Sequence, residues 1–281
     1  MTTESPTLGY MAVSDLKDIA ANWQLYKGFT VRPLPSTEQF YRYVVEHFSD
    51  PDQKLMAYGG TPEIRTVIHD ANRQAVIVDR APVMVYAMGL LTSGEKPVLD
   101  NERVVQGDWL NMPFGKSFAH LAFGDDAVNM IKWESFDRYM HEAHRVLLDN
   151  GLFACHLLVQ PEERFRRQST VDVIREYEVR KIKSEFDLAS RINFTFYDEE
   201  TYQMGWQRSI AGLKRLREIR EIDSIQGFIK RFENSNSIFA CPPQQEWEKL
   251  IEPLFSIEEI FYPSEHDYCR FEPLYLLRKR T

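Results

Sequence analysis

Two adjacent glycines, Gly59 and Gly60, separate an apolar run from three residues that are typical of a helix start. Thr61 suits the N-cap, Pro62 the first helical position, and Glu63 the first turn. A helix that begins directly after a strand exposes backbone N–H groups, and glycines let a ligand approach the chain closely. The pattern therefore predicts an anion site that suits a carboxylate, although a plain strand-to-helix turn explains the same residues equally well.

An acid follows each of the next two apolar runs. Asp79 ends the run 75–78 and lies twenty residues beyond Gly59, a spacing at which a carboxylate at a strand tip accepts hydrogen bonds from ribose hydroxyls. Asp108 and Trp109 follow the third run and offer an acceptor for an adenine amine beside an aromatic ring. Either acid alone is more often a surface turn residue. Three successive strands that end in this way predict a site for an adenosine-containing ligand.

A parallel sheet would bring these residues to one edge, and residues 54–159 alternate between strand-like and helical patterns as such a sheet requires. After the last predicted helix, Asp149, Asn150 and Gly151 are typical of a helix stop and a turn into the next strand. We expect strands at residues 54–58, 75–78, 103–105, 119–123 and 152–159, and helices at residues 62–71, 83–91 and 136–148.

The segments on either side of this region break the alternation. Before it, helices are expected at residues 16–26 and 37–48, joined by the proline-stiffened segment 32–35. After it, residues 161–236 are rich in helical patterns, and only residues 192–197 look like a strand. We interpret this second segment as an insertion that packs over one end of the sheet.

The order of the motifs resembles that of class I S-adenosylmethionine-dependent methyltransferases. The segments that carry the resemblance read LMAYGGTPE, VIVDRAPVM, VVQGDWLNMPF, SFAHLAFGDDAV and MHEAHRVLLDNGLFACHLL. It implies an α/β, Rossmann-like fold with a mostly parallel seven-stranded sheet, an antiparallel last strand, and helices on both faces. The upstream residues Trp23, Arg32 and Pro33 are similar to a lead-in found in a branch whose cofactor loop reads G-x-T-P-E.

Two closing strands, at residues 257–262 and 274–279, complete the predicted sheet and are joined by the polar segment 264–270. The expected organisation is a helical lead-in or lid at residues 1–50, a Rossmann-like cofactor-binding core at 51–160, a helical insertion and substrate lid at 161–245, and the closing strands at 246–281.

S-adenosylmethionine is the cofactor that the resemblance implies, with S-adenosylhomocysteine as the product. The resemblance implies that Asp79 binds the ribose, that Asp108 approaches the adenine, and that residues 145–151 have a structural role. No residue is predicted to be catalytic or to bind a metal, because methyl transfer is an in-line displacement that positioning in a dry pocket can accelerate without a base. The residues predicted to bind the cofactor are Tyr58, Gly59, Gly60, Thr61, Glu63, Asp79, Arg80, Met84, Asp108, Trp109 and Asp125.

The glycine loop departs from the family pattern. Ala57 stands where the usual loop has an acid, and Thr61 and Glu63 stand where it has glycines. The cofactor's amino group therefore needs another acceptor, for which Glu63 and the pair Asp125 and Asp126 are both candidates. Loss of the glycines is also consistent with a weakened or inactive site, although both strand-tip acids are present.

Several other polar residues have a chemical and a structural interpretation. Asp125 and Asp126 could orient an amine substrate or bind a metal, or they could form a turn or helix cap. Asp125 is the better candidate because it directly follows a glycine. His120 alternates within a strand and is expected to be a packed histidine, and His141 and His144 are expected to lie on a helix away from the strand tips.

Composition limits the partners of the protein. Its 281 residues, of which 43% are hydrophobic and 27% charged, can bury a substantial core. A net charge of −8 disfavours a nonspecific nucleic-acid binder, and the basic surplus in residues 208–231 is expected to be a solvated helix face. A small-molecule substrate is therefore favoured over nucleic acid, with a monomer or a homodimer as the oligomeric state.

Cysteine spacing and the N-terminal sequence indicate the compartment. Cys155, Cys241 and Cys269 include no C-x-x-C pair, so neither a disulfide framework nor a thiolate zinc site is predicted. No signal-peptide pattern is found, and the longest apolar run, residues 81–91, is too short to span a bilayer. We expect a cytoplasmic protein without a membrane segment.

Two other functions fit parts of the same pattern. A noncatalytic protein could keep the fold and the adenosyl ligand for assembly or regulation. A nicotinamide-dependent oxidoreductase would also use Asp79 for a ribose, but the sequence GGTPE lacks the G-x-G-x-x-G spacing that a pyrophosphate requires.

Overall fold

The computed structural model describes residues 13–24, 32–182, 185–215, 226, 229, 238–265 and 269–281, with only the backbone described for a few residues in helices and strands. The chain divides into two compact units. The first comprises Met1–Asp125, Arg145–Ala154 and Thr281, and the second comprises Asp126–His144 and Cys155–Arg280.

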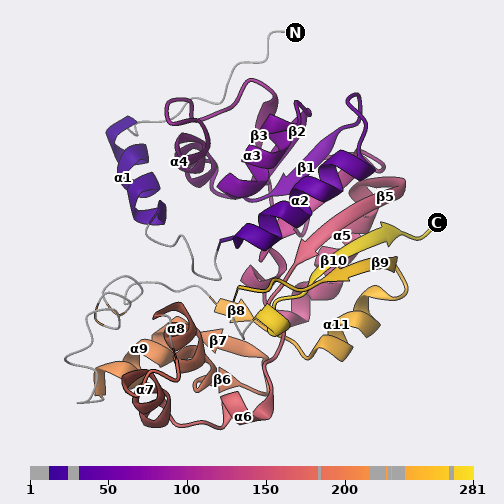
Figure 1. Cartoon of the computed structure of the whole chain (residues 1–281). Coiled ribbons are helices and arrows are strands. Elements are labelled where there is room, and N and C mark those ends of the chain that lie inside the picture. The colour runs from indigo at the N-terminus through magenta and orange to yellow at the C-terminus, as the bar shows by residue number, and fades with distance from the viewer. Residues whose placement is uncertain are drawn as a thin grey trace. The chain divides into compact units, whose positions relative to one another are not determined.

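A seven-stranded sheet with the order β3-β2-β1-β4-β5-β10-β9 is the centre of the fold (Figure 1). Strand β1 pairs in parallel with β2 and with β4, β2 pairs in parallel with β3, and β9 and β10 pair antiparallel. This is the mostly parallel, Rossmann-like sheet that the sequence predicts. The strands are β1 (Leu55–Tyr58), β2 (Ala75–Asp79), β3 (Glu102–Gln106), β4 (Ala119–Asp125), β5 (Leu147–His156), β9 (Phe255–Phe261) and β10 (Leu274–Lys279).

Strand register places the predicted site residues at one edge of this sheet. Tyr58 at the end of β1 is paired with Val78, and Asp79 at the end of β2 is paired with Gln106 at the end of β3. All four residues of β1 and the first four of β2 are buried, as expected for central parallel strands that are covered on both faces. The carboxyl ends of β1, β2 and β3 therefore lie side by side.

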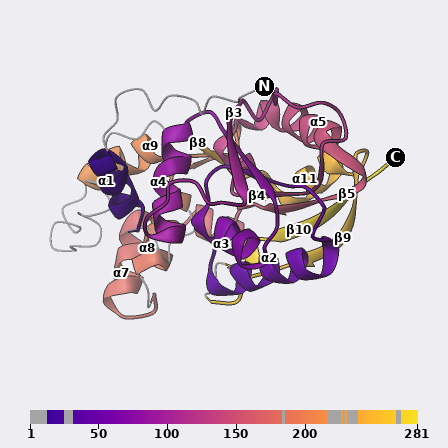
Figure 2. The ribbon, with the colours of Figure 1, turned by 90° about the horizontal axis from the view of Figure 1, so that it is seen from above.

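Helices of the first unit cover this part of the sheet. Helices α2 (Pro35–Phe48) and α3 (Pro62–Asp70) lie next to each other on one face (Figure 2). Helix α4 (Pro82–Ser93) contacts β2, β3 and α3, and α1 (Val13–Gln24) packs on α4 through an apolar cluster that includes Leu16, Ala20 and Met88. The lead-in helices are thus part of the same unit as the glycine loop.

The second unit contains a smaller sheet and its own core. Buried residues of α7, α8 and α9, among them Val173, Ile192 and Leu213, form one hydrophobic cluster. Strands β6, β7 and β8 form a three-stranded antiparallel sheet. Its further elements are α5 (Phe136–Val146, which ends in the first unit), α6 (Glu163–Arg166), α7 (Thr170–Glu178), α8 (Glu185–Phe194), β6 (Tyr197–Asp198), β7 (Gln203–Gly205), α9 (Trp206–Arg215), β8 (Ile238–Ala240) and α11 (Gln244–Ile251), with single 3₁₀ turns at Val128–Met130, Trp133–Ser135 and Cys269–Phe271.

Two local predictions were wrong. In the stretch 192–197, which is predicted to be a strand, the first three residues form the last turn of α8 and only Tyr197 belongs to a strand. The apolar residue Ile192 is buried as part of a helix, in the core of the second unit. The predicted turn at 149–151 lies within β5, where Asn150 has a φ of 61° and a Cβ atom at Gly151 would lie 2.8 Å from the Leu148 carbonyl oxygen and 3.0 Å from that of His120. Close backbone approach, rather than a helix stop, explains that glycine.

Among the described residues, no helix is long and apolar enough to cross a membrane. Residues 25–26 of the first predicted helix lie outside the described residues, as does most of the basic segment 208–231.

Candidate functional site

Gly59 is the residue around which the site is built. It has a φ of 87°, in the left-handed region that favours glycine, and its N–H donates to the Val78 carbonyl oxygen at 2.9 Å. A Cβ atom at this position would lie 3.6 Å from Cζ2 of Trp109 and 3.7 Å from Oδ2 of Asp79. The ends of β1 and β2 and the segment after β3 therefore converge on the space beside this glycine.

Gly60 has a different role, because it lets the loop pack against α4. A Cβ atom on Gly60 would lie 2.9 Å from the Cα atom of Val85, which is closer than real Cβ contacts come. The next residues form the helix start that the sequence predicts: Thr61 is the N-cap, Pro62 is the first helical residue, and Glu63 lies in the first turn. The Thr61 side chain makes no capping hydrogen bond.

The two carboxylate oxygens of Asp79 have different surroundings. Oδ1 accepts a hydrogen bond from the Ala81 N–H at 2.7 Å and so fixes the entry to α4, whereas Oδ2 is the atom directed toward Gly59. Burial raises the pKa of Asp79, and hydrogen bonds from the Ala81 and Arg80 backbone and the charge of Arg80 partly oppose this shift. Oδ1 thus fixes the entry to α4, and Oδ2 faces the space beside Gly59.

Asp108 lies in a tight, exposed turn after β3. Its Oδ1 accepts from the Leu110 N–H at 2.9 Å and from Nη2 of Arg80 at 2.7 Å, and its backbone pairs with Asn111. The Arg80–Asp108 ion pair is solvent-exposed, with 67% and 43% of the side chains accessible, so it contributes little stability. It does link the tips of β2 and β3.

Trp109 is held in a fixed position beside the glycine loop. Its Nε1–H donates to the Val78 carbonyl oxygen at 2.8 Å, and its ring centroid lies 6.4 Å from that of Tyr58. Tyr58 is buried and makes an edge contact with Phe153 at 5.4 Å. Met84, by contrast, packs against the apolar cluster of α1 and α4.

Glu63 and Arg32 form a buried ion pair. Nε of Arg32 donates to Oε1 of Glu63 at 2.9 Å, and Nη2 contacts the same oxygen. The side chains are 5% and 10% exposed. Burial raises the pKa of Glu63 above its usual value, Arg32 and the residue's own backbone lower it, and the negative charge of Asp125 raises it further. The lead-in that contains Arg32 therefore reaches the first turn of α3.

The two acids at the end of β4, Asp125 and Asp126, have separate partners. Asp125 is buried and its Oδ1 accepts from the Tyr41 hydroxyl at 2.7 Å. Asp126 has a φ of 52° and is buried within the second unit, where its Oδ1 lies 3.7 Å from Nδ1 of His156. The turn interpretation applies to Asp126, whose carbonyl oxygen accepts from the Asn129 N–H at 3.1 Å.

Comparison with known proteins rests on structure. No protein-family model matches the chain, and no curated protein matches its sequence. A SAM-dependent methyltransferase from Methanosarcina mazei is similar with a TM-score of 0.54 and 10% identity, over 88% of this chain and 98% of the other. The 1,6-didemethyltoxoflavin-N1-methyltransferase of Burkholderia thailandensis, solved with 1,6-didemethyltoxoflavin and S-adenosylhomocysteine, is similar with a TM-score of 0.52 and 8% identity, over 99% and 95%. The chain has the class I methyltransferase fold.

A third structure carries a different description. A protein from Rhodobacter sphaeroides described as a putative Zn-dependent alcohol dehydrogenase matches with a TM-score of 0.56 and 12% identity, over 94% of this chain and 99% of the other. At such low identities these similarities show the fold alone.

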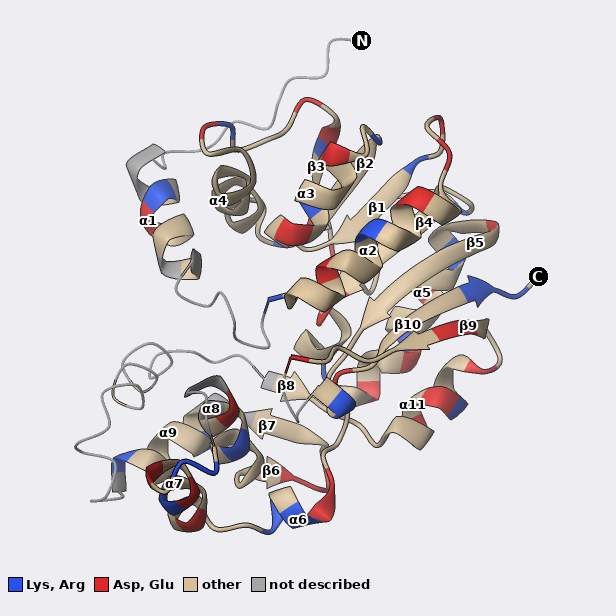
Figure 3. Cartoon of the chain, in the orientation of Figure 1, with Lys and Arg blue, Asp and Glu red and all other residues tan. Residues whose placement is uncertain are grey.

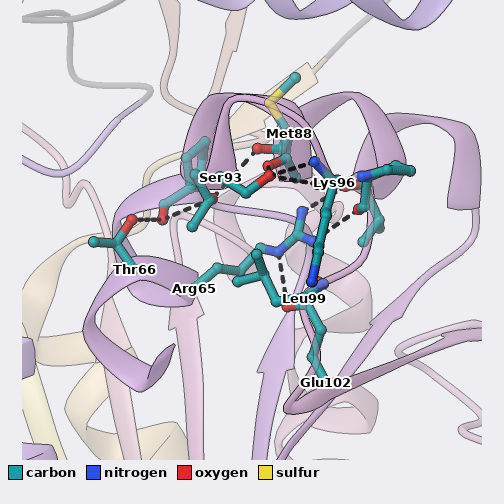
Figure 4. A network of polar contacts seen from close by, with 12 residues as sticks. Arg65, Thr66, Met88, Ser93, Lys96, Leu99 and Glu102 are labelled. Carbon is teal, nitrogen blue, oxygen red and sulfur yellow. Dashed lines mark hydrogen bonds and ion pairs between the residues drawn. The ribbon is translucent and has the colours of Figure 1, made fainter. Parts of the chain in front are cut away.

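A buried ion pair stabilises the methyltransferase fold behind the site (Figure 4). Arg65 of α3 is fully buried, and its Nε donates to Glu102 at 3.0 Å while Nη2 contacts the other Glu102 oxygen. The same guanidinium donates to the carbonyl oxygens of Val85 in α4 and Pro97. Because all these groups are hydrogen-bonded, the ion pair connects α3, α4 and β3, the elements that position the glycine loop and the strand tips.

Sequence reasoning missed three of these residues. Arg65 lies at a helical position where an arginine is usually solvated, and Tyr41 is 84 residues away from Asp125 in the chain. His156 lies at the end of the apolar strand β5, and no spacing relates it to Asp126. For these contacts the sequence contains no local signal.

The three histidines that are predicted to have no catalytic role each contact a backbone oxygen. His120 is half-buried and its Nε2 lies 3.2 Å from the Phe48 carbonyl oxygen. His141 and His144 bond backbone oxygens of Asp137 and Arg280 at 2.9 Å.

In the described part of the insertion, α7 carries three acidic residues and one basic residue (Figure 3). Arg208 pairs with Asp198 at 2.7 Å and Lys214 is exposed. The other bases counted in the basic segment lie outside the described side chains: Arg215, Arg217, Arg220, Lys230 and Arg231.

Proposed function

We propose that this protein is an S-adenosylmethionine-dependent methyltransferase that acts on a small molecule. The observation that carries the proposal is the convergence of Asp79 Oδ2 and the Trp109 ring on Gly59, a residue with a positive φ and no side chain. A hydrogen-bond acceptor and an aromatic ring beside a bare backbone segment are what an adenosyl ligand requires.

The residues at the strand tips fit such a cofactor. Oδ2 of Asp79 would accept from the ribose hydroxyls, Asp108 would accept from the adenine amine, and Trp109 would cover one side of the ligand. When bound, the cofactor supplies a methyl group that its sulfonium charge already activates toward displacement. The protein would then hold the acceptor in line with that methyl group and exclude water, and no proton acceptor is required for this role.

A small-molecule acceptor agrees with the charge of the protein. The net charge of −8 opposes attraction of the chain to nucleic acid phosphates, and α7 likewise carries three acids and one base. The Burkholderia neighbour was solved with bound 1,6-didemethyltoxoflavin and S-adenosylhomocysteine, which is consistent with this choice.

The alternative function is that of a nicotinamide-dependent oxidoreductase, since the Rhodobacter neighbour is described as an alcohol dehydrogenase. Dinucleotide-binding sheets have the order 3-2-1-4-5-6, in which the last strand lies at the edge. Here the last strand in the chain, β10, lies between β5 and β9. This topology and the loop GGTPE both favour the methyltransferase.

Ligand binding and turnover test the proposal together. S-adenosylmethionine and S-adenosylhomocysteine should raise the melting temperature of the protein, because a ligand that binds only the folded state stabilises it by mass action. NADH at the same concentration should not. Labelled methyl transfer into a small-molecule extract should then be detected. A higher melting temperature with NADH but not with the adenosyl ligands would instead favour the oxidoreductase. Binding of the adenosyl ligands without methyl transfer in any extract would favour a noncatalytic binding protein.

A further inference from the structure

A hollow of about 560 Å³ lies in the second unit, where α11 meets the edge strand β9. One face of α11, the first residues of β9 and Arg280, which follows β10, line this α11–β9 hollow. Its apolar lining consists of the buried residues Ile251 and Phe255 and of Ile257, which is 41% exposed. The hollow is open to solvent, whereas a small-molecule pocket buries most of the surface of its ligand. The surface of another macromolecule therefore fits it better.

The outer edge of β9 is protected against the addition of another strand. The pairing of β9 with β10 skips Glu258, so a bulge interrupts β9 near its centre. The next residue, Glu259, is also acidic and is exposed. Bulges and charged side chains on an edge strand both oppose pairing with a further strand. A partner would therefore use the side chains around the α11–β9 hollow and not the backbone of β9.

Acidic and basic residues both line the hollow, and they differ in whether the chain itself provides a partner. Lys249 pairs with Glu246 at 2.9 Å, and Glu248 accepts hydrogen bonds from two side chains. Glu252, at the end of α11, and Arg280 are exposed, and neither forms an ion pair within the part of the chain that the structure describes. The hollow thus presents one acid and one base that a partner can pair.

A second copy of this chain can pair both charges at once. In a two-fold dimer the same surface lies on both sides, so Glu252 of each copy can meet Arg280 of the other. A partner of a single sign, such as a nucleic acid or an anionic membrane, would leave one of the two charges unmatched. Figure 3 shows acidic residues on α11 and basic residues at the end of β10.

The net charge of −8 makes two copies repel each other except where opposite charges face. The hollow provides such a place on a surface that also exposes Ile257. We propose that two copies of this chain associate through the α11–β9 hollow, with reciprocal Glu252–Arg280 ion pairs and an apolar contact that includes Ile257.

Charge reversal at the two positions tests the proposal, with the oligomeric state measured by analytical ultracentrifugation and native mass spectrometry. Wild-type protein should form a dimer whose fraction rises with concentration. Glu252→Arg and Arg280→Glu should each raise the dimer dissociation constant by about ten- to a hundredfold, because each places like charges opposite each other twice in the dimer. An equimolar mixture of the two variants should form heterodimers as tightly as wild type dimerises, because the two bases of one chain then face the two acids of the other.

Matched substitutions outside the hollow serve as controls. Arg175→Glu reverses an exposed base of α7 and should dimerise as wild type does. Ile257→Asp should weaken the dimer, because it places a charge in the apolar part of the contact. Val179→Asp, at an apolar residue that is 65% exposed and does not line the hollow, should leave the dimer unchanged.

Three results would overturn the inference. A wild-type monomer at every concentration would leave a different protein or a small ligand as the occupant of the hollow. A dimer that neither charge reversal weakens would have its interface elsewhere. A mixture of the two variants that stays monomeric would show that Glu252 and Arg280 do not meet. The wild-type measurement needs no substitution, and recovery in the mixture requires both variants to be folded, so misfolding cannot imitate the expected result.

Discussion

Replacing Asp79 by alanine and by asparagine separates the two uses of its carboxylate. Alanine removes both the Oδ1 bond to the Ala81 N–H, at 2.7 Å, and the Oδ2 acceptor beside Gly59. Asparagine can still accept a hydrogen bond from the Ala81 N–H through its amide oxygen. Its neutral NH₂ group, which donates hydrogen bonds, then stands where Oδ2 was. The two variants therefore differ in loop stability and share the loss of the charged acceptor.

The size of each effect follows from these contacts. Hydrogen bonds to a charged group are worth about 1.5–3 kcal/mol each, and water replaces part of this. With one tenfold change per about 1.4 kcal/mol, Asp79→Ala should lower affinity for S-adenosylhomocysteine roughly ten- to a thousandfold. Asp79→Asn should fall between alanine and wild type.

Although Asp79→Asn should bind the ligand more weakly than wild type, its free energy of unfolding should not fall. Burial raises the pKa of Asp79, so the ionised group destabilises the ligand-free fold increasingly as pH rises from the unfolded pKa through the folded one. At pH 7 Asp79→Asn should thus be at least as stable as wild type, whereas Asp79→Ala should be less stable because α4 loses its anchoring bond.

Isothermal titration calorimetry and urea unfolding at pH 7 measure the two quantities on the same samples. Unchanged affinity in folded Asp79→Ala would remove β2 from the site and refute the alignment of the three strand tips. A loss of more than about 1 kcal/mol of unfolding free energy in Asp79→Asn would show that the ionised carboxylate stabilises the fold, contrary to the burial argument.

Three further substitutions test the scaffold. Gly60→Ala should destabilise the protein by about 1–3 kcal/mol in urea unfolding, because its Cβ would lie 2.9 Å from the Val85 Cα atom, while Gly115→Ala, with open space around it, should be nearly neutral. Arg65→Met should cost about 3–5 kcal/mol by leaving Glu102 buried and unpaired, and an added Glu102→Leu should recover much of the loss. Asp108→Ala should keep the melting temperature within a few degrees yet weaken adenosyl ligands in calorimetry; unfolding would make Asp108 structural.

Local signals in the sequence sufficed for the sheet and for the positions of most site residues. Thr61 and Pro62 predicted the start of α3, and unbroken apolar runs predicted β1 and β2, because central parallel strands are buried on both faces. Once the strands are parallel, the acids that follow them must lie at the same edge. This is why Asp79 and Trp109 could be placed together with Gly59 before the structure was known.

The remaining features depend on tertiary contacts. Strand β8 has three residues and pairs with β7, which lies more than thirty residues earlier, and so short a run carries no usable periodicity. Met84 is predicted to bind the cofactor, and the contacts that its side chain makes with the apolar cluster of α1 and α4 could not be read from the sequence. Which oxygen of Asp79 faces the loop likewise depends on the φ angle of Gly59 and on Ala81.

The Arg32–Glu63 ion pair also determines where this protein can be shortened. A fragment that begins at residue 51 would retain the complete glycine loop but would leave the Glu63 carboxylate without its cation. That carboxylate would then have to take up a proton or move to the solvent, and the first turn of α3 would shift with it. The segment upstream of α2 is therefore a folding partner of the loop, and an autonomous fragment would need either that segment or a neutral side chain at position 63.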